Sequence, residues 1–329
     1  MFKYILKRLL LSIFILLGVS LIIYILVRSM PYDFVSNKIS ALQSNTSLDA
    51  TAVEKMYEMY GLQDNSFLGI LKGYANWLGA LCRFDFGKSF VYGDSVLNII
   101  VDKMGVSFAV ALIATFFEFL IAIPLGITAA THQYSLRDYV VTILVMVGIS
   151  LPTFFFGQIL KDLFAMKLGW FPPSGLLDAS QTLDGIALLG DYLRHMFIPI
   201  LTVVILSIGG RMRMTRTNML EVLSSDYIRT ARAKGLKEKI VIYKHAFRNT
   251  LIPLVTSLAG LLPSLFSGAI ITEQVFDLPG IGNVAFKAMM QADIPFIMGY
   301  NMFLALLSVV GVLLADLMYA VVDPRVKLS

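Results

Sequence analysis

The chain has 329 residues, of which 57% are hydrophobic and only 15% are charged, and its formal net charge is +5. A soluble domain has a smaller apolar share and a larger charged share, so this composition excludes a soluble globular protein and predicts a polytopic α-helical membrane protein. The one cysteine, Cys82, excludes an internal disulfide, and the three histidines are too widely separated to form one metal cluster.

The first predicted element is a membrane span over residues 9–27. Lys7 and Arg8 precede this apolar run, which is long enough to cross a bilayer and ends at Arg28 without a small-x-small cleavage site. We therefore expect an uncleaved span instead of a signal peptide. Its N-terminus is expected inside the cell, because Lys and Arg beside a span are retained in the cytoplasm.

Residues 30–101 are polar enough to form a small insertion outside the membrane. Within this insertion we predict one helix over residues 53–60 and a second over residues 74–81. Trp77 lies in the second helix, and we expect it at the level of the lipid headgroups, where tryptophan is enriched.

The tripeptide Gly87-Lys88-Ser89 superficially resembles part of a phosphate-binding loop. However, the position five residues before Gly87 is Cys82 instead of glycine, and no apolar strand leads into the segment. We therefore predict no nucleotide site here. The sequence also lacks the common metalloprotease, thiol redox and serine hydrolase motifs, so we expect no catalytic residue and no metal on this chain.

Five further apolar runs predict the remaining spans. Both termini then lie inside, and 16 of the 27 Lys and Arg residues fall on predicted cytoplasmic segments, as the positive-inside rule requires. The predicted organisation is a tail and first span (1–29), the insertion (30–101) and a core of five spans (102–329). These five spans are expected over residues 106–130, 140–160, 195–210, 251–271 and 296–322.

Three residues within these spans are candidates for functional roles. A carboxylate in the hydrocarbon region costs roughly 2.5 to 3.5 kcal/mol, so Glu118 is expected either to line the pore or to hydrogen-bond to a neighbouring helix. Pro152 frees a backbone carbonyl and bends its span, which makes it a second candidate for the pore wall. Asp316 lies near the cytoplasmic end of the last span, and we expect it to pair with a basic cytoplasmic loop.

That basic loop is the stretch 211–250, which carries ten Lys or Arg residues and three acidic residues between two apolar runs. Within it we expect a short helix over residues 227–234. One side chain of the segment Ser224-Ser225-Asp226 is expected to cap this helix, and Gly235 is expected to end it in a left-handed conformation. So short a helix is marginal alone in water, and we therefore expect it to dock on something.

One face of this short helix carries two small residues. Ala231 and Gly235 lie four residues apart on the same face, and two small residues there allow close approach of another backbone. Arg229 and Arg232 would remain free to bind carboxylates. The alternative is a polybasic loop that only attracts anionic lipid.

The segment Asp226-Tyr-Ile-Arg-Thr-Ala-Arg-Ala-Lys-Gly-Leu236, followed by His245-Ala-Phe-Arg-Asn249 and Pro253, resembles the "EAA" loop of ABC importer permeases. Its form is similar to that of the B-type subunit in the dipeptide/oligopeptide/nickel permease family. The resemblance covers nearly the whole chain, although Pro31-Tyr-Asp-Phe34 departs from the usual Pro-Gly-Asp-Pro. Further matching segments are residues 17–20, 60–62, 85–89, 168–175, 273–282 and 293–295, together with Asp316.

The resemblance implies an all-α, type I ABC importer permease fold of six transmembrane helices in the cytoplasmic (inner) membrane. It also implies a second homologous permease subunit, two ATPase subunits that carry ATP and Mg, and an extracytoplasmic peptide-binding protein. This chain itself is expected to bind lipid but no cofactor and no nucleic acid. The residues implied to couple it to the ATPase are Asp226, Tyr227, Ile228, Arg229, Thr230, Ala231, Arg232, Ala233, Lys234, Gly235, Leu236, His245, Arg248 and Asn249.

The implied function is that of a permease subunit in an ATP-driven importer of di- or oligopeptides. Nickel is the alternative substrate within the family, and the sequence of the permease leaves this choice open because selection is made largely by the binding protein. An alternative from another class is a channel or membrane scaffold that needs no ATPase.

Overall fold

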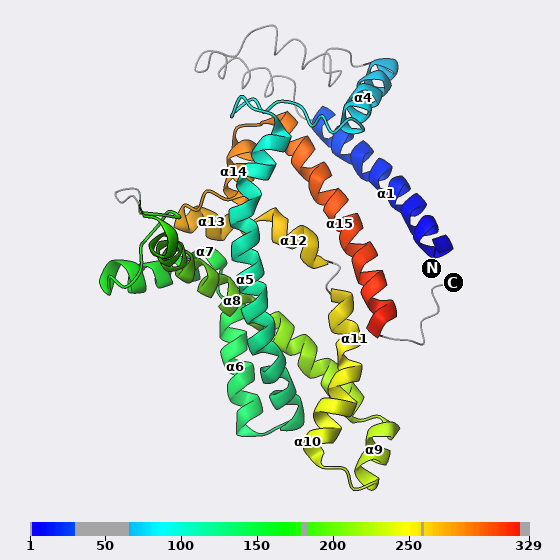
Figure 1. Ribbon diagram of the computed structural model, residues 1–329, viewed down its shortest axis with the longest axis vertical. Coiled ribbons are helices and arrows are strands. Elements are labelled where there is room, and N and C mark those ends of the chain that lie inside the picture. Colours follow the sequence, from blue (N-terminus) through cyan, green and yellow to red (C-terminus); the bar gives the residue numbers. More distant parts are fainter. Residues whose placement is uncertain (1, 30–65, 179–182, 258–259, 323–329) are drawn as a thin grey trace. The chain divides into compact units, whose positions relative to one another are not determined.

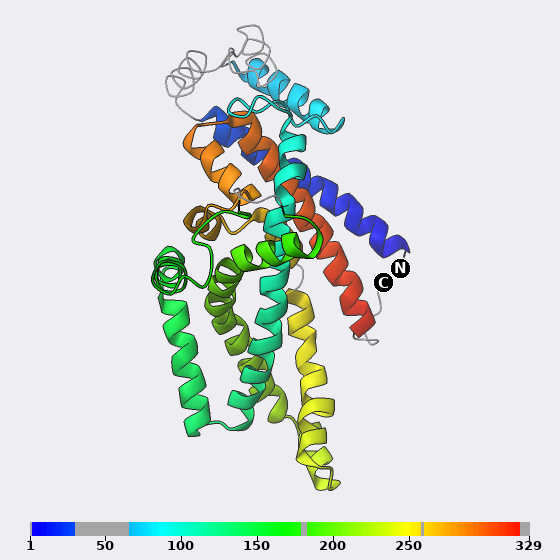
Figure 2. The same ribbon diagram turned by 60° about the vertical axis from the view of Figure 1, so that its left-hand side comes forward.

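The computed structural model describes four stretches of the chain, residues 2–29, 66–178, 183–257 and 260–322. They form helices joined by loops (Figures 1 and 2). Within these ranges no strand is formed, although an isolated antiparallel bridge joins Lys88 and Ser95. The prediction of an all-α protein is confirmed.

Among the described helices, four are long and apolar enough to cross a membrane. They are α1 (Phe2–Arg28), α5 (Val96–Thr131), α8 (Gly185–Leu223) and α15 (Ile294–Val322), and they contain the first, second, fourth and last predicted spans. The described residues account for a fifth span if α6 (Leu136–Ser150) and the bent segment after it count as one broken span.

The predicted span over residues 140–160 is not a straight helix. The chain turns by 103° between α6 and the segment that begins with α7 (Thr153–Leu160) and continues into the π-helix η1 (Lys161–Lys167). Leu151 has an extended backbone at the turn, with φ −87° and ψ 131°, and Pro152 follows it. The residue before a proline is disfavoured in helical conformation and the proline has no N–H to donate, so the helix ends here.

The predicted span over residues 251–271 is also interrupted. Its described residues belong to α11 (Phe247–Ser257), α12 (Leu261–Ser267) and the start of α13 (Ile270–Phe276). Gly268 separates α12 from α13 and has a φ of +71°. Glycine adopts this conformation without steric cost, whereas a right-handed helix cannot continue through it.

Helices α5 and α8 extend beyond the spans that we predicted. α5 begins at Val96, ten residues before the predicted start, and α8 covers residues 185–223 instead of 195–210. Hydropathy marks the part of a helix that crosses the bilayer, whereas the backbone hydrogen bonds of the helix continue until a turn ends it. Residues 211–223, which we predicted in the cytoplasmic loop, therefore belong to α8.

The described chain divides into two compact units. The first contains Met1–Gly105 and Gly280–Val310, and the second contains Val106–Pro279 and Gly311–Leu328. Helices α5 and α15 therefore contribute residues to both. The boundaries that we predicted for an insertion at residues 30–101 stay a prediction, and the helix predicted over residues 53–60 lies outside the described residues.

In the first unit, α4 (Phe67–Leu81) contains the helix predicted over residues 74–81 and begins seven residues earlier. Trp77 is 1% exposed and lies against Tyr24 of α1, with 6.1 Å between the ring centroids. The ring of Trp77 is thus covered by the chain itself, and its expected position at the level of the lipid headgroups stays a prediction.

The first unit also joins two segments that the sequence analysis singled out separately. Asp293 is fully buried, and its carboxylate accepts hydrogen bonds from the hydroxyl of Ser89 and from the backbone N–H groups of Phe90 and Val91, both at 3.1 Å. The Ser89 hydroxyl thus binds a carboxylate of its own chain. The segment that superficially resembled a phosphate loop packs instead against the start of α15.

In the second unit, α5 and α8 approach each other closely at Gly126. A Cβ placed on Gly126 would lie 2.8 Å from the backbone oxygen of Met212 and 2.6 Å from Cβ of Thr215. The short helices α9 (Asp226–Ala233) and α10 (Glu238–Ile240) lie at the lower end of this unit, beyond α11, in both views (Figures 1 and 2). The short helices of the predicted basic loop therefore lie next to the ends of the long helices α5 and α8.

Candidate functional site

The predicted short helix exists as α9, which has eight residues. Ser225 occupies the N-cap position with an extended backbone (φ −74°, ψ 152°), although its hydroxyl donates to the backbone oxygen of Val222 instead of capping α9. Gly235 follows the helix with a φ of +74°. The predicted helix and the left-handed glycine that ends it are confirmed. The predicted side-chain cap is wrong, because α9 has no side-chain hydrogen bond at its N-cap.

A cluster of apolar side chains, which we name the coupling-loop core, holds α9 in place. Ile228 is fully buried and Ala231 is 7% exposed. They pack with residues from the ends of α5 and α8 and from the π-helix η2 (Val241–Ala246). Burial of these side chains supplies the stability that eight residues lack on their own. The remaining members of the core are Ile127, Ala130, Met219, Val241 and Ala246.

Ala231, which we predicted to allow close approach of another backbone, is 7% exposed within the described chain. Ala231 faces the coupling-loop core, so its small side chain serves the packing of α9 on its own chain. Gly235 is exposed, and a Cβ placed on it would meet no atom within 4 Å. We predicted that α9 docks on a surface, and within the described chain that surface is the second unit of the same chain.

The segment 245–249, which follows α9 in the predicted coupling motif, forms a hydrogen bond with α9. Asn249 Nδ2 of α11 donates to the hydroxyl of Tyr227 on α9 at 3.0 Å and lies equally close to the backbone oxygen of His245. Thr250 is fully buried, and its hydroxyl donates to the backbone oxygen of Ala246 at 3.1 Å. Residues 22 positions apart in the sequence are thereby brought into direct contact.

Arg232 is not free, which corrects our prediction that it remains available to bind carboxylates of a partner. Its guanidinium donates from Nη2 to Glu238 Oε1 at 2.7 Å and from Nε to Oε2 at 3.2 Å. The hydrogen bonds from Arg232 hold the pKa of Glu238 below its ordinary value. The turn at Gly235 brings the two side chains together, a contact that helical spacing alone does not predict. Arg229 is exposed and lies 3.6 Å from the equally exposed Asp226.

The face of α9 that points away from the coupling-loop core is polar and basic. Of the fourteen predicted coupling residues, Ile228 and Ala231 are buried and His245 is half-buried. The other eleven are exposed: Asp226, Tyr227, Arg229, Thr230, Arg232, Ala233, Lys234, Gly235, Leu236, Arg248 and Asn249. The arrangement therefore offers a preformed, positively charged helical surface on a rigid base.

Glu118 hydrogen-bonds to a neighbouring helix, which is one of the two roles that we predicted. Arg211 Nε of α8 donates to Glu118 Oε1 of α5 at 3.0 Å, and Arg211 Nη1 donates to the hydroxyl of Ser257 in α11 at 2.8 Å. The guanidinium also lies 4.4 Å from the ring centroid of Phe119. Arg211, which we predicted in the cytoplasmic loop, thus ties three helices together.

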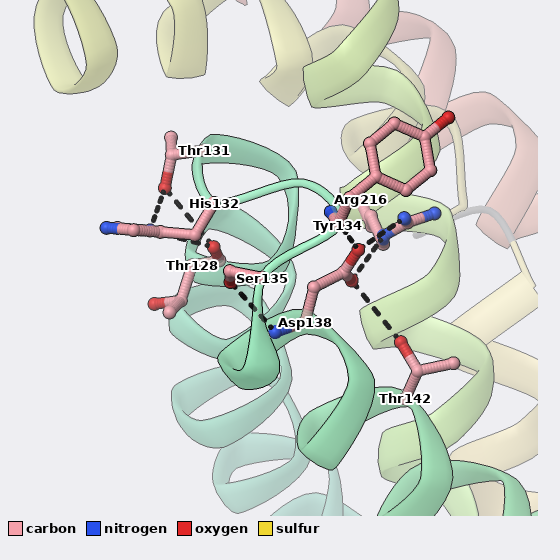
Figure 3. Close-up of polar contacts among 8 residues, drawn as sticks. All are labelled: Thr128, Thr131, His132, Tyr134, Ser135, Asp138, Thr142 and Arg216. Atoms are coloured by element: carbon pink, nitrogen blue, oxygen red, sulfur yellow. Dashed lines mark hydrogen bonds and ion pairs between the residues drawn. The ribbon is translucent and has the colours of Figure 1, made fainter.

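Sequence reasoning missed a further ion pair, which is shown in Figure 3. Asp138 of α6 is 4% exposed and accepts two hydrogen bonds from Arg216 of α8, from Nε at 3.0 Å and from Nη2 at 2.9 Å. The backbone N–H of Tyr134 and the hydroxyl of Thr142 also donate to this carboxylate, at 3.2 and 3.4 Å. Asp138 and Arg216 are 78 residues apart, so no local signal indicates the pair.

The roles of two further candidates, Pro152 and Asp316, stay predictions. Pro152 stands at the N-cap of α7 in the 103° turn, and its role in a pore wall stays a prediction. Asp316 lies in α15, and its pairing with the basic loop likewise stays a prediction. Among the described residues, no group of three or more His, Cys, Asp or Glu side chains is arranged to hold a metal ion.

Comparison with known proteins assigns the family. A sequence profile described as "Binding-protein-dependent transport system inner membrane component" matches residues 122–328. The chain belongs to this family. The permease is also 37% identical to the oligopeptide transport system permease protein AppB of Bacillus subtilis (strain 168), over 99% of this chain and 100% of that protein.

A second relative and a solved structure agree with this assignment. The permease is 32% identical to a protein of Brucella abortus (strain 2308) named as a peptide transport system permease, over 98% of each chain. Its fold is similar to a chain in the inward-facing MetNI methionine ABC transporter, with a TM-score of 0.53 and 18% identity, over 69% of this chain and 97% of that chain. The predicted permease fold is confirmed.

Proposed function

We propose that this permease is a transmembrane subunit of an ATP-driven, binding-protein-dependent importer of di- and oligopeptides. The observation that carries the proposal is the match to an oligopeptide permease over the full length of both chains. The substrate class follows from that name and from the peptide permease of Brucella abortus. The permease would be a non-catalytic subunit in the cytoplasmic membrane, with ATP and Mg bound by the partner ATPases.

The proposed assembly contains a second homologous permease chain, two ATPase subunits and an extracytoplasmic peptide-binding protein. In it the exposed face of α9 binds a cleft of one ATPase on the cytoplasmic side. The basic character of Arg229 and Lys234 supports contact with acidic groups of that partner. Both chain termini lie in the cytoplasm in this orientation, which the distribution of Lys and Arg supports.

The coupling-loop core indicates how movement of an ATPase would reach the membrane. Ile228 and Ala231 fix α9 to Met219 near the end of α8 and to Ile127 near the end of α5. A displacement of α9 therefore pulls on both long helices, because a close-packed core transmits strain instead of absorbing it. The free energy of coupling comes from the difference in docking between the nucleotide states of the ATPase.

A bulky substitution at Gly235 tests the coupling role. Gly235→Trp places a large side chain on the exposed face and strains a backbone with a φ of +74°. We expect the complex to remain membrane-inserted while peptide-stimulated ATP hydrolysis and peptide uptake in proteoliposomes are lost. Gly93→Trp is the matched control, since Gly93 has a φ of +68° and equally open surroundings. Normal uptake by Gly235→Trp would refute the coupling role.

Disulfide or maleimide cross-linking tests the location of α9. In a Cys82→Ser background, Ala233→Cys supplies one reactive thiol on the exposed face of the helix. We expect cross-links to an ATPase subunit whose yield changes when nucleotide is added. Peptide flux that is independent of ATP would support a channel instead, and ATP-dependent uptake of nickel but not of peptide would assign the other substrate.

A further inference from the structure

A groove between α6 and α8 combines an apolar wall with two arginines. Its volume is about 310 Å³. The apolar part of the lining comes from Val145, Met146 and Ile149 of α6 and from Met212 of α8, and the polar part includes Arg213 and Arg216 of α8. Met146 and Ile149 are about half exposed, so the groove opens onto the surface of the described chain.

The two arginines lie at the end of the groove where α6 begins. Arg216 is bound by Asp138, which lies in the first turn of α6 (Figure 3). Arg213 lies about one turn earlier than Arg216 on α8. Farther along, α6 meets α8 at Gly209, where an added Cβ would lie 3.0 Å from a methyl group of Val145. The groove therefore has a basic end and an apolar continuation.

The charges at the basic end are not balanced within the described chain. Asp138 engages Nε and Nη2 of Arg216, which leaves Nη1 outside both hydrogen bonds. Arg213 is exposed and makes no hydrogen bond or ion pair with any described residue. It lies three residues beyond the span predicted over residues 195–210, on the predicted cytoplasmic side of α8, where basic residues attract anionic lipid headgroups.

We propose that this groove binds one anionic phospholipid. The headgroup phosphate would accept hydrogen bonds from Arg213 and from Nη1 of Arg216, whose guanidinium Asp138 holds in position. One acyl chain would follow Val145, Met146 and Ile149. Basic pockets between membrane helices bind anionic headgroups in this way, and charge-assisted hydrogen bonds to phosphate are among the stronger ones. A free phosphate ion would leave the apolar wall uncovered, so we commit to a lipid.

Native mass spectrometry tests the site directly. The full-length permease, with the subunits that co-purify in mild detergent, is stripped of lipid and titrated with dioleoylphosphatidylglycerol or dioleoylphosphatidylcholine. We expect tighter binding of the anionic lipid. Arg213→Gln should weaken phosphatidylglycerol binding about fivefold, the effect of one basic residue near a membrane surface, and should leave phosphatidylcholine unchanged. Arg213→Lys should retain most of the preference.

Two further variants test whether anionic lipid binds in this groove or is attracted equally by any exposed basic residue. Lys244→Gln removes one charge from the exposed surface of η2, outside the groove, and should have no effect on either lipid. Met146→Trp fills the apolar part and should weaken both lipids. Equal binding of the two lipids by the unmodified permease, or equal losses in Arg213→Gln and Lys244→Gln, would overturn the proposal.

The last arm identifies what covers the groove in a membrane. A photoreactive benzoylphenylalanine at Met146, in proteoliposomes that contain phosphatidylglycerol, should attach to lipid. Attachment to a second permease chain would assign the groove to a subunit interface and overturn the lipid site. All variants are first checked for co-elution and an unchanged melting temperature, and Arg213→Lys keeps the test informative if Met146→Trp fails to fold.

Discussion

At the scale of single residues, Asp293 shows how the permease stabilises a buried charge with hydrogen bonds. Its side chain is fully buried, and burial raises the pKa of the carboxyl group. The Ser89 hydroxyl and the N–H groups of Phe90, Val91 and Phe296 act in the opposite direction, because hydrogen bonds to a carboxylate favour the charged form. Four donors from two segments thus meet on one side chain.

The variant Asp293→Asn tests this arrangement. An amide has the shape of the carboxylate, but its NH₂ group cannot accept the hydrogen bonds from Ser89 and Val91. Leaving buried donors unsatisfied costs about 1 to 3 kcal/mol, so we expect a lower melting temperature for the detergent-solubilised permease. Asp102→Asn is the control, because Asp102 is 70% exposed in its pair with Lys103 and should have little effect. Equal melting temperatures for Asp293→Asn and the unmodified permease would contradict this account.

Glu238 gives a prediction about pH. Its pKa is lowered by the hydrogen bonds from Arg232, so the pair contributes stability above the unfolded pKa of Glu, about 4.3, and that stability is lost as pH falls through the lower folded value. Both groups are about half exposed, which limits the contribution to less than about 1 kcal/mol.

We therefore expect Glu238→Gln to speed amide exchange around Gly235 at pH 7 by about twofold to fivefold, after correction for intrinsic rates. The difference from the unmodified permease should vanish at acid pH, where Glu238 is protonated in both folded and unfolded chains. Exchange that differs equally at both pH values would show that the carboxylate charge is not responsible. Asp226→Asn, which alters the looser pair with Arg229, should change exchange less.

At the scale of elements, the contact of α5 with α8 depends on Gly126. A methyl group there would overlap the backbone oxygen of Met212, and a backbone atom cannot move without moving its helix. We expect Gly126→Ala to separate the helices and to destabilise the permease by about 1 to 3 kcal/mol. Gly105→Ala in the same helix meets no atom within 4 Å and should be neutral or slightly stabilising, since Ala favours helix. Similar melting temperatures for both variants would contradict the close contact.

The sequence predicted the position of α9 but not how its side chains are paired and buried. The absence of Pro and Gly over residues 227–234 and the glycine at 235 are local signals, and they were sufficient to place the helix, although the side-chain cap that we predicted does not form. The direction that Ala231 faces and the pairing of Arg232 with Glu238 depend on how the chain folds back after Gly235. Small residues indicate close packing, but spacing alone does not say whether the partner is another protein or η2 of the same chain.

At the scale of the whole molecule, composition predicted the all-α membrane class, and the motif of α9 predicted the family. The number of continuous spans was less predictable. Pro152 and Gly268 interrupt apolar runs that are long enough to cross a bilayer, and hydropathy does not register a change of backbone direction. The ion pairs of Asp138 and Glu118 join distant helices, so only the assembled fold shows them.

The bonds between Asp293 and the segment around Ser89 limit how relatives of this permease can be recombined. The two segments are 204 residues apart in sequence, yet they satisfy each other's polar groups. A hybrid gene that takes residues 85–95 from one parent and the start of α15 from another would pair a carboxylate with a loop shaped for a different acceptor. Crossover points that keep both segments from a single parent should therefore yield more folded hybrids than points that split them.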